Sequence, residues 1–326
     1  MNTGSFYFNG NEMKKAAVLP AQGIGDSLLM LIASYNLQEA GYQVTTFQPI
    51  LEQLQDWLKN KEFHPLPHIN DLEASLSEQD LIILQNDNSA QSKHLIELKR
   101  QGKLKQLHVF YPTYQELKHG PLDTSDYVFE ERLCMVENIA IATAKLLHLA
   151  GVSRNNGLTP LEHLTHKKHA SRIILHPTSS QISKNWSADK FIHLAQKLQK
   201  QKFEVIFAVS PAEHAEWTQL LGGNWSLPLL PLLSDLAALI YESGYIIGND
   251  SLVGHLASNL QIPSIILAND KKRMRLWRPG WLKGEVITPD SFFACFILKK
   301  RSTIQWSPHI SVRAVYNKFK KLYLQL

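Results

Sequence analysis

The sequence contains little cysteine and no long apolar run. Its two cysteines, Cys134 and Cys295, lie far apart without metal-ligand spacing, which argues against a disulfide framework and fits a reducing compartment. No stretch of about 18 apolar residues occurs, so we expect no membrane-spanning helix. The first dozen residues, MNTGSFYFNGNE, lack the basic start and apolar stretch of a signal peptide. We therefore expect a cytoplasmic protein.

Several motifs of metal and catalytic sites are also missing. No HExxH occurs, and the histidines of the Pro-rich and linker segments have no cysteine partners, so we expect no zinc site. These histidines are His64, His68, His163, His166 and His169. No Asp-x-Asp stands at a cleft-facing position to hold a diphosphate through a metal, and no Gly-x-Ser-x-Gly elbow occurs. The sequence predicts neither a metal nor a cofactor.

The composition is that of a globular chain with room for two domains. It has 326 residues, of which 44% are hydrophobic and 19% charged. The net charge of +5 is unevenly placed, because residues 268–326 carry 13 Lys and Arg against three acids. This basic segment faces either an anionic membrane surface, an acidic substrate or simply solvent.

Strand-like and helix-like runs alternate along the chain. We expect strands near residues 16–19, 42–47, 81–84, 172–175, 204–209, 245–247 and 264–267, with helices between them and a final helix over 312–326. Such repetition predicts parallel sheets with helices on both faces. The polar segment His163–Ser171 interrupts the rhythm as a linker. The fold class is therefore α/β, with two Rossmann-like doubly wound domains, 1–165 and 166–326, facing a central cleft; the terminal helix packs on either lobe.

The first candidate site is the turn Gly23-Ile24-Gly25-Asp26 after the first strand. Ligands of open α/β sheets bind at this place. A dinucleotide fingerprint would need a third glycine where Leu28 stands, so a nicotinamide cofactor is not expected. Asp26 is either the N-cap of a helix that begins at Ser27 or a general base that points across the cleft. Spacing alone favours the cap.

Two further strand-to-helix turns lie in the C-terminal half. Thr178 and Ser179, in the turn His176-Pro177-Thr178-Ser179, can donate hydrogen bonds to phosphate, and Lys184 can supply positive charge. A polar loop of this kind is equally often only a loop. Its Lys184-Asn185-Trp186 continuation would place Trp186 beneath it.

The turn Gly248-Asn249-Asp250-Ser251 gives the stronger signal. Backbone N–H groups and the helix dipole make such a helix start suitable for phosphate. Ser251 can cap the helix and bind an anion, and His255 lies one turn further on the same face. Alternatively, Asp250 only braces the turn, and His255 is a packed or capping residue of the helix. Two anion-binding turns in one lobe favour a diphosphate ligand such as a nucleotide-sugar.

The loop Trp277-Arg278-Pro279-Gly280-Trp281 and the basic stretch Lys271–Arg275 before it are ambiguous. They contact either a sugar or phosphate, or they form a turn whose aromatic side chains pack against the terminal helix.

Taken together, these motifs resemble the ADP-heptose:lipopolysaccharide heptosyltransferases, glycosyltransferase family 9. The matching elements are Gly-x-Gly-Asp at the first strand, the His-x-Thr/Ser turn followed by Lys-x-Trp, and Asp-Ser/Thr-Gly-x-x-His at the nucleotide turn. Leu232 and Leu233 loosely match the family's apolar adenine-side segment. The likeness covers most of the C-terminal lobe and the first forty or so residues.

The resemblance implies a GT-B fold and inverting, metal-independent transfer of a sugar, heptose from ADP-heptose, to a lipopolysaccharide-core, lipid-linked or other glycan acceptor. Asp26 would then be the catalytic base. The donor would be held by Gly25, Thr178, Ser179, Lys184, Leu232, Asp250, Ser251, Leu252 and His255. The basic segment would make peripheral contact with the inner membrane, and no nucleic acid partner is expected.

The chain also departs from the family pattern. Leu252 replaces the glycine after Asp-Ser, and Ala268-Asn269-Asp270 replaces the usual Gly-Pro-Thr after the last core strand. A positive φ at position 252 would be costly for leucine. These departures leave a catalytically degenerate GT-B protein that binds a nucleotide or a protein partner as the main alternative, with a sugar-nucleotide hydrolase or epimerase as a third.

Overall fold

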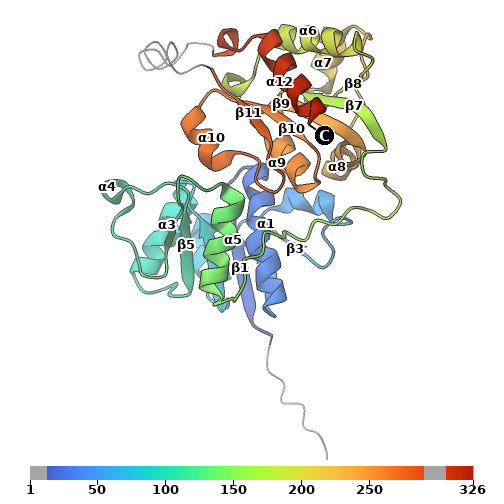
Figure 1. Cartoon of the computed structure of the whole chain (residues 1–326). Coiled ribbons are helices and arrows are strands. Elements are labelled where there is room, and N and C mark those ends of the chain that lie inside the picture. The colour runs from blue at the N-terminus through green and yellow to red at the C-terminus, as the bar shows by residue number, and fades with distance from the viewer. Residues whose placement is uncertain (1–12, 290–305, 326) are drawn as a thin grey trace, which may run out of the picture.

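The computed structural model describes residues 13–289 and 306–325. Two α/β lobes lie one above the other, with the N-terminal lobe below in Figure 1. Residues 1–12, Cys295 and the basic residues Lys299, Lys300 and Arg301, on which parts of the sequence argument rest, lie outside the described residues.

The first lobe is built on a six-stranded parallel sheet in the order β3-β2-β1-β4-β5-β6. Its strands are β1 (Lys15–Leu19), β2 (Gln43–Thr46), β3 (Glu62–Phe63), β4 (Leu81–Gln85), β5 (Leu107–Tyr111) and β6 (Tyr127–Val128). The run Leu81–Gln85 is buried at every position, as expected for a strand covered on both faces. The order reverses between β1 and β4, which makes the carboxyl ends of these two strands a binding position.

Helices cover this sheet on both faces. They are α1 (Ile24–Glu39), α2 (Leu72–Leu76), α3 (Ala90–Arg100), α4 (Glu116–His119) and α5 (Met135–Leu146), with 3₁₀ helices η1 (Pro49–Leu54) and η2 (Ile69–Asp71). Helix α1 is buried over most of its length because it lies among β1, α5 and the second lobe. It therefore reads as apolar on nearly all sides, unlike a surface helix.

The second lobe has a five-stranded parallel sheet in the order β11-β10-β9-β7-β8. Its strands are β7 (His169–His176), β8 (Glu204–Phe207), β9 (Ser243–Asn249), β10 (Ser264–Leu267) and β11 (Glu285–Ile287). Its helices are α6 (Ala188–Gln199), α7 (His214–Leu221), α8 (Leu233–Tyr241), α9 (Leu252–Asn259), α10 (Lys271–Trp277) and α12 (Val312–Leu324), with η3 (Ile182–Lys184) and η4 (Ser307–His309). The strand order reverses between β7 and β9, so the second binding position lies there.

The terminal helix α12 packs on the second lobe (Figure 1). The alternative that it packs back on the N-terminal lobe is wrong. Phe319 is buried, and its ring centroid lies 5.1 Å from that of Phe203 and 5.3 Å from that of Tyr245. The chain before α12 is also tied to this lobe, because Trp306 Nε1 donates to the Ser183 carbonyl and Trp186 Nε1 to the Ile310 carbonyl.

An apolar interface joins the two lobes. Helix α1 lies against α9, and one buried cluster contains Leu28, Leu31 and Trp57 of the first lobe together with Val253 and Leu256 of the second. The loop after α10 makes a second contact. None of the helices among the described residues is long and apolar enough to cross a membrane.

Candidate functional site

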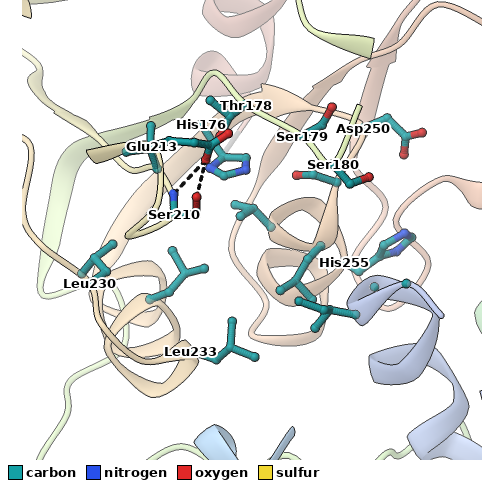
Figure 2. Close-up of a pocket in the computed structure, with 18 of the residues that line it drawn as sticks. His176, Thr178, Ser179, Ser180, Ser210, Glu213, Leu230, Leu233, Asp250 and His255 are labelled. Atoms are coloured by element: carbon teal, nitrogen blue, oxygen red, sulfur yellow. Dashed lines mark hydrogen bonds between the residues drawn. The ribbon is translucent and has the colours of Figure 1, made fainter. Parts of the chain in front are cut away.

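A cavity of about 390 Å³ lies where the carboxyl ends of the two sheets face each other. All ten residues expected at the site line it: Gly25, Asp26, Thr178, Ser179, Lys184, Leu232, Asp250, Ser251, Leu252 and His255. In Figure 2 the Thr178–Ser180 loop, Asp250 and His255 lie around one part of the cavity, and Leu230 and Leu233 around another. The structure brings together three motifs that are far apart in the sequence; their roles stay predictions.

Asp26 lies in the first turn of α1, which begins at Ile24 with Gly23 as its N-cap. The expectation that Asp26 is itself the N-cap of a helix starting at Ser27 is wrong, because the helix starts three residues earlier. Its carboxylate lies back over Gly23, where a Cβ would stand 2.6 Å from Oδ2. A glycine at this position therefore leaves room for the carboxylate.

The surroundings of Asp26 favour its protonated form more than water does. Burial raises the pKa of its carboxyl to about 6, against an opposing hydrogen bond from Gln85 and the charges of Arg273 and Lys184. Gln85 Nε2 donates to Asp26 Oδ1 at 2.9 Å across the β1–β4 switch point. Gln85 Oε1 accepts from the Ala21 amide at 3.3 Å, so both ends of this buried side chain are engaged.

The turn His176-Pro177-Thr178-Ser179, which follows β7, is held in place by the side-chain amide of Asn249. Asn249 Nδ2 donates to the Pro177 carbonyl at 2.7 Å, and its Oδ1 accepts from the Trp186 amide at 3.0 Å. Trp186 is buried beneath the loop, as expected. The Ser179 hydroxyl lies 2.7 Å from Asn185 Oδ1 and donates to it, so its proton is already used inside the loop. Ser179 is thus less free to donate to a phosphate than the sequence suggests.

The second turn opens helix α9 at the β9 end of the cavity. Ser251 is the N-cap residue, but its side chain makes no capping hydrogen bond, contrary to expectation. Ser251 Oγ and His255 Nδ1 are buried polar atoms without a partner among the described residues. Burial lowers the pKa of the His255 imidazole to about 4, so this ring is neutral at physiological pH. The hydrogen-bonding capacity of both atoms is therefore unused by the described residues.

Asp250 lies between two cationic side chains. Its Oδ2 is 3.8 Å from Lys184 Nζ and 3.6 Å from Arg273 Nε. The carboxylate thus holds a lysine of one loop and an arginine of α10 on the same side of the cavity.

Leu252, the replacement for a family glycine, is the first residue of α9 and is not among the residues with positive φ. The leucine is therefore not strained there. Close approach is provided by Gly25 instead, where a Cβ would lie 3.5 Å from both Leu252 Cα and His255 Cδ2. The start of α1 and the start of α9 meet at this glycine.

The cavity also contains residues that sequence reasoning missed. An apolar wall of Val209, Leu230, Pro231 and Leu236 continues from Leu232 and Leu233, the two leucines that the sequence indicates. At its edge, the Ser210 hydroxyl donates to Glu213 at 2.6 Å (Figure 2). Arg273 and Trp277 of α10 line the cavity as well, so one arginine of the ambiguous basic stretch and the first residue of the Trp277–Trp281 loop lie at the site. The signal available for Arg273 was Asp270, an N-cap type three residues before it.

The site chemistry rests on oxygen, nitrogen and charge. Within residues 13–289 and 306–325, no group of three or more His, Cys, Asp or Glu side chains is placed to hold a metal ion. Burial raises the pKa of the Cys134 thiol to about 11, so it is no nucleophile at neutral pH.

Comparisons with known proteins agree with this geometry. A model of glycosyltransferase family 9 (heptosyltransferase) matches residues 134–280, which include both turns that we expect to bind an anion. Lipopolysaccharide heptosyltransferase 3 of Escherichia coli K12 is 30% identical over 114 residues, which cover 33% of this chain and 33% of the relative. The chain thus spans about a third of the length of the curated relative that it matches.

Solved structures share the fold over nearly the whole chain. ADP-heptose LPS heptosyltransferase II of E. coli has a TM-score of 0.65 at 18% identity and covers 95% of this chain and 99% of its own. E. coli heptosyltransferase WaaC, solved with ADP, has a TM-score of 0.64 at 14% identity, with coverage of 94% and 99%. The expected GT-B arrangement is confirmed by these folds. Together with the motifs, residues 134–280 of this chain are similar to glycosyltransferase family 9, and the whole chain shares the fold of these heptosyltransferases.

Proposed function

We propose that this protein transfers a sugar from an ADP-sugar, ADP-heptose in the first instance, to a hydroxyl group of a lipopolysaccharide-core or other glycan acceptor. One observation carries the proposal: a single cavity between the lobes has a carboxylate of raised pKa on one wall and two cations beside a helix start on the other.

The donor is held by the second lobe. Its diphosphate binds at Lys184, the Thr178–Ser179 turn and the start of α9, where N–H groups and the helix dipole favour anions. The adenine lies against the apolar wall that includes Leu232, and the ribose hydroxyls donate to Glu213. The names of solved relatives support this choice, since E. coli WaaC was solved with ADP and with ADP-2-deoxy-2-fluoro heptose.

The acceptor approaches from the first lobe. The Asp26 carboxylate takes the proton of the acceptor hydroxyl, whose oxygen forms a bond to C1 of the sugar. The C1–O bond to the diphosphate breaks, and ADP leaves with the electron pair. Attack from the side opposite the leaving group inverts the configuration at C1. A pKa of about 6 makes Asp26 a stronger base than an ordinary aspartate while it remains ionised at neutral pH.

Charge on the departing diphosphate is stabilised by fixed groups of the protein. Lys184 and the amides at the start of α9 supply this stabilisation, so the transfer proceeds without a metal ion. Transfer activity should therefore persist in excess EDTA. A loss of activity that added Mg²⁺ restores would contradict this part of the proposal.

The test has two stages. Calorimetric titration with ADP, UDP, GDP and NAD should show selective ADP binding. Release of ADP from ADP-heptose with an acceptor should then be lost in Asp26→Ala while ADP affinity is retained. Full activity of Asp26→Ala would overturn the assigned base. Binding without turnover would favour a degenerate nucleotide-binding protein, and release of free sugar without acceptor would favour a hydrolase.

We further propose that the protein works on the cytoplasmic side of the inner membrane through its basic segment, residues 268–326. In the described part of this segment, Lys320, Lys321, Tyr323 and Leu324 of α12 are exposed. Cations beside apolar side chains suit the surface of an anionic bilayer.

A further inference from the structure

Arg273 occupies a wall of the cavity that the family motifs do not describe. It lies on α10, directly after the Ala268-Asn269-Asp270 segment that replaces Gly-Pro-Thr. Asp270 Oδ1 accepts from the amides of Lys272 and Arg273 at 2.8 and 3.0 Å. The replacement therefore caps the short helix that carries this arginine to the cavity.

The guanidinium plane of Arg273 is fixed from the side. Its Cζ lies 4.8 Å from the centroid of the Trp277 ring, in a cation–π contact. Trp277 packs against the buried cluster of the first lobe that contains Leu276. The arginine is thus stacked on a ring that is itself held by both lobes.

The hydrogen-bonding edge of this guanidinium is available. Asp250 faces it with Oδ2 at 3.6 Å from Nε, which is an ion pair longer than a hydrogen bond. Among the described residues its guanidinium N–H groups form no hydrogen bond, and 41% of its side chain is exposed. A stacked, planar fork with unused donors is the arrangement that binds phosphate oxygens in pairs.

The charges around the cavity favour an anion at this point. Lys184 and Arg273 share the single carboxylate of Asp250, so this wall carries a surplus positive charge. Ser251 Oγ, buried and without a partner among the described residues, is on the same wall. Asp250 lies between Lys184 and Arg273, and this spacing of the two cations suits two neighbouring phosphate groups.

We propose that Arg273 is a second cation that binds the diphosphate of the donor, together with Lys184. Asp250 holds the two cations in place before the ligand arrives, and the guanidinium then takes phosphate oxygens. The interaction strengthens as negative charge develops on the leaving diphosphate. This inference rests on the proposed function, since it assigns a residue to the same donor.

The test compares ADP with adenosine in calorimetric titrations of the full chain. Arg273→Ala should weaken ADP binding roughly tenfold, as expected for loss of a charge-assisted contact, and leave adenosine binding unchanged. Arg273→Lys should give an intermediate loss, because it keeps the charge and removes the fork. Arg275→Ala, on the same helix and away from the cavity wall, removes the same charge and should leave ADP affinity unchanged.

The outcomes separate the two proposals. If the wild-type chain binds ADP and Arg273→Ala binds it equally well, the role of Arg273 is overturned and the donor assignment survives. The role is also overturned if Arg273→Ala weakens adenosine binding as much as ADP binding, or if Arg275→Ala weakens ADP binding as much as Arg273→Ala does. If the wild-type chain binds no ADP, the proposed function fails and the inference fails with it.

Discussion

The Asp26 carboxyl and its single amide partner set the expected pH dependence of transfer. Because the pKa of this carboxyl is raised to about 6, the base is protonated below that pH and the rate should rise as pH increases through about 6. Gln85 donates to the ionised form and so opposes the rise. Gln85→Leu should move the acidic limb of the kcat/KM profile upward by about one pH unit. An unmoved limb would show that the Gln85 hydrogen bond does not lower the pKa of Asp26.

The same residue should lower stability at neutral pH. Its pKa in the folded protein, about 6, lies above the ordinary value of 3.8, so the folded state holds this proton more tightly. The resulting stabilisation is complete below about pH 4 and is lost as pH rises through 6. Asp26→Asn should therefore raise the free energy of unfolding by about 1–2 kcal/mol at pH 8 and not at pH 4. Urea titrations at both pH values test this, with Asp56→Asn, an exposed carboxyl, as the reference.

At the scale of elements, the loop after α10 depends on one glycine. A Cβ at Gly280 would lie 2.5 Å from Cys134 Sγ and 2.9 Å from Val136, both at the buried start of α5. We expect Gly280→Ala to lower the free energy of unfolding by about 1–3 kcal/mol, since the loop must shift away from the first lobe. Gly151→Ala has open space around its Cβ and serves as the control. Equal stability of the two variants in denaturant titrations would show that this contact is not tight.

The elements also show what local sequence pattern can predict. The expected strand 264–267 matches β10 residue for residue, because a short apolar run between turn residues has one plausible reading. The start of α1 was misplaced, because Gly23 caps it without a side-chain hydrogen bond and leaves no signature. In the sequence, Gln85 is only a polar residue at the end of an apolar strand. It becomes a partner of Asp26 because its strand, β4, lies beside β1 in the sheet. Contacts of this kind arise from topology rather than from spacing along the chain.

At the scale of the whole molecule, the sequence predicts residues on both walls of the cavity but not all the residues that line it. Three motifs converged because the carboxyl ends of parallel strands meet at one edge of each sheet. Arg273 and Trp277 reach the cavity from α10, a helix whose position depends on contact with the first lobe. The lobe that receives the terminal helix stays open in the sequence for a similar reason: the buried face of Val315 and Phe319 is evident from periodicity, but its partner is not.

The uneven charge of the chain leads to a prediction about membranes. Helix α12 has no acidic residue, and its Lys320 and Lys321 lie beside the exposed Tyr323 and Leu324. The full chain should co-float with vesicles of phosphatidylglycerol and phosphatidylcholine at low salt. Release should follow at about 0.5 M salt, where charges are screened within a few ångström.

Replacing both lysines with glutamate, Lys320→Glu with Lys321→Glu, should weaken vesicle binding at least about tenfold, since each basic residue near an anionic surface contributes about 1 kcal/mol and the new charges repel it. Lys105→Glu with Lys118→Glu makes the same change of net charge at exposed positions of the first lobe. If both double variants lose binding equally, attraction depends on net charge alone and α12 is not the contact. If the wild-type chain stays with the soluble fraction at low salt, the basic segment faces solvent or an acidic substrate instead.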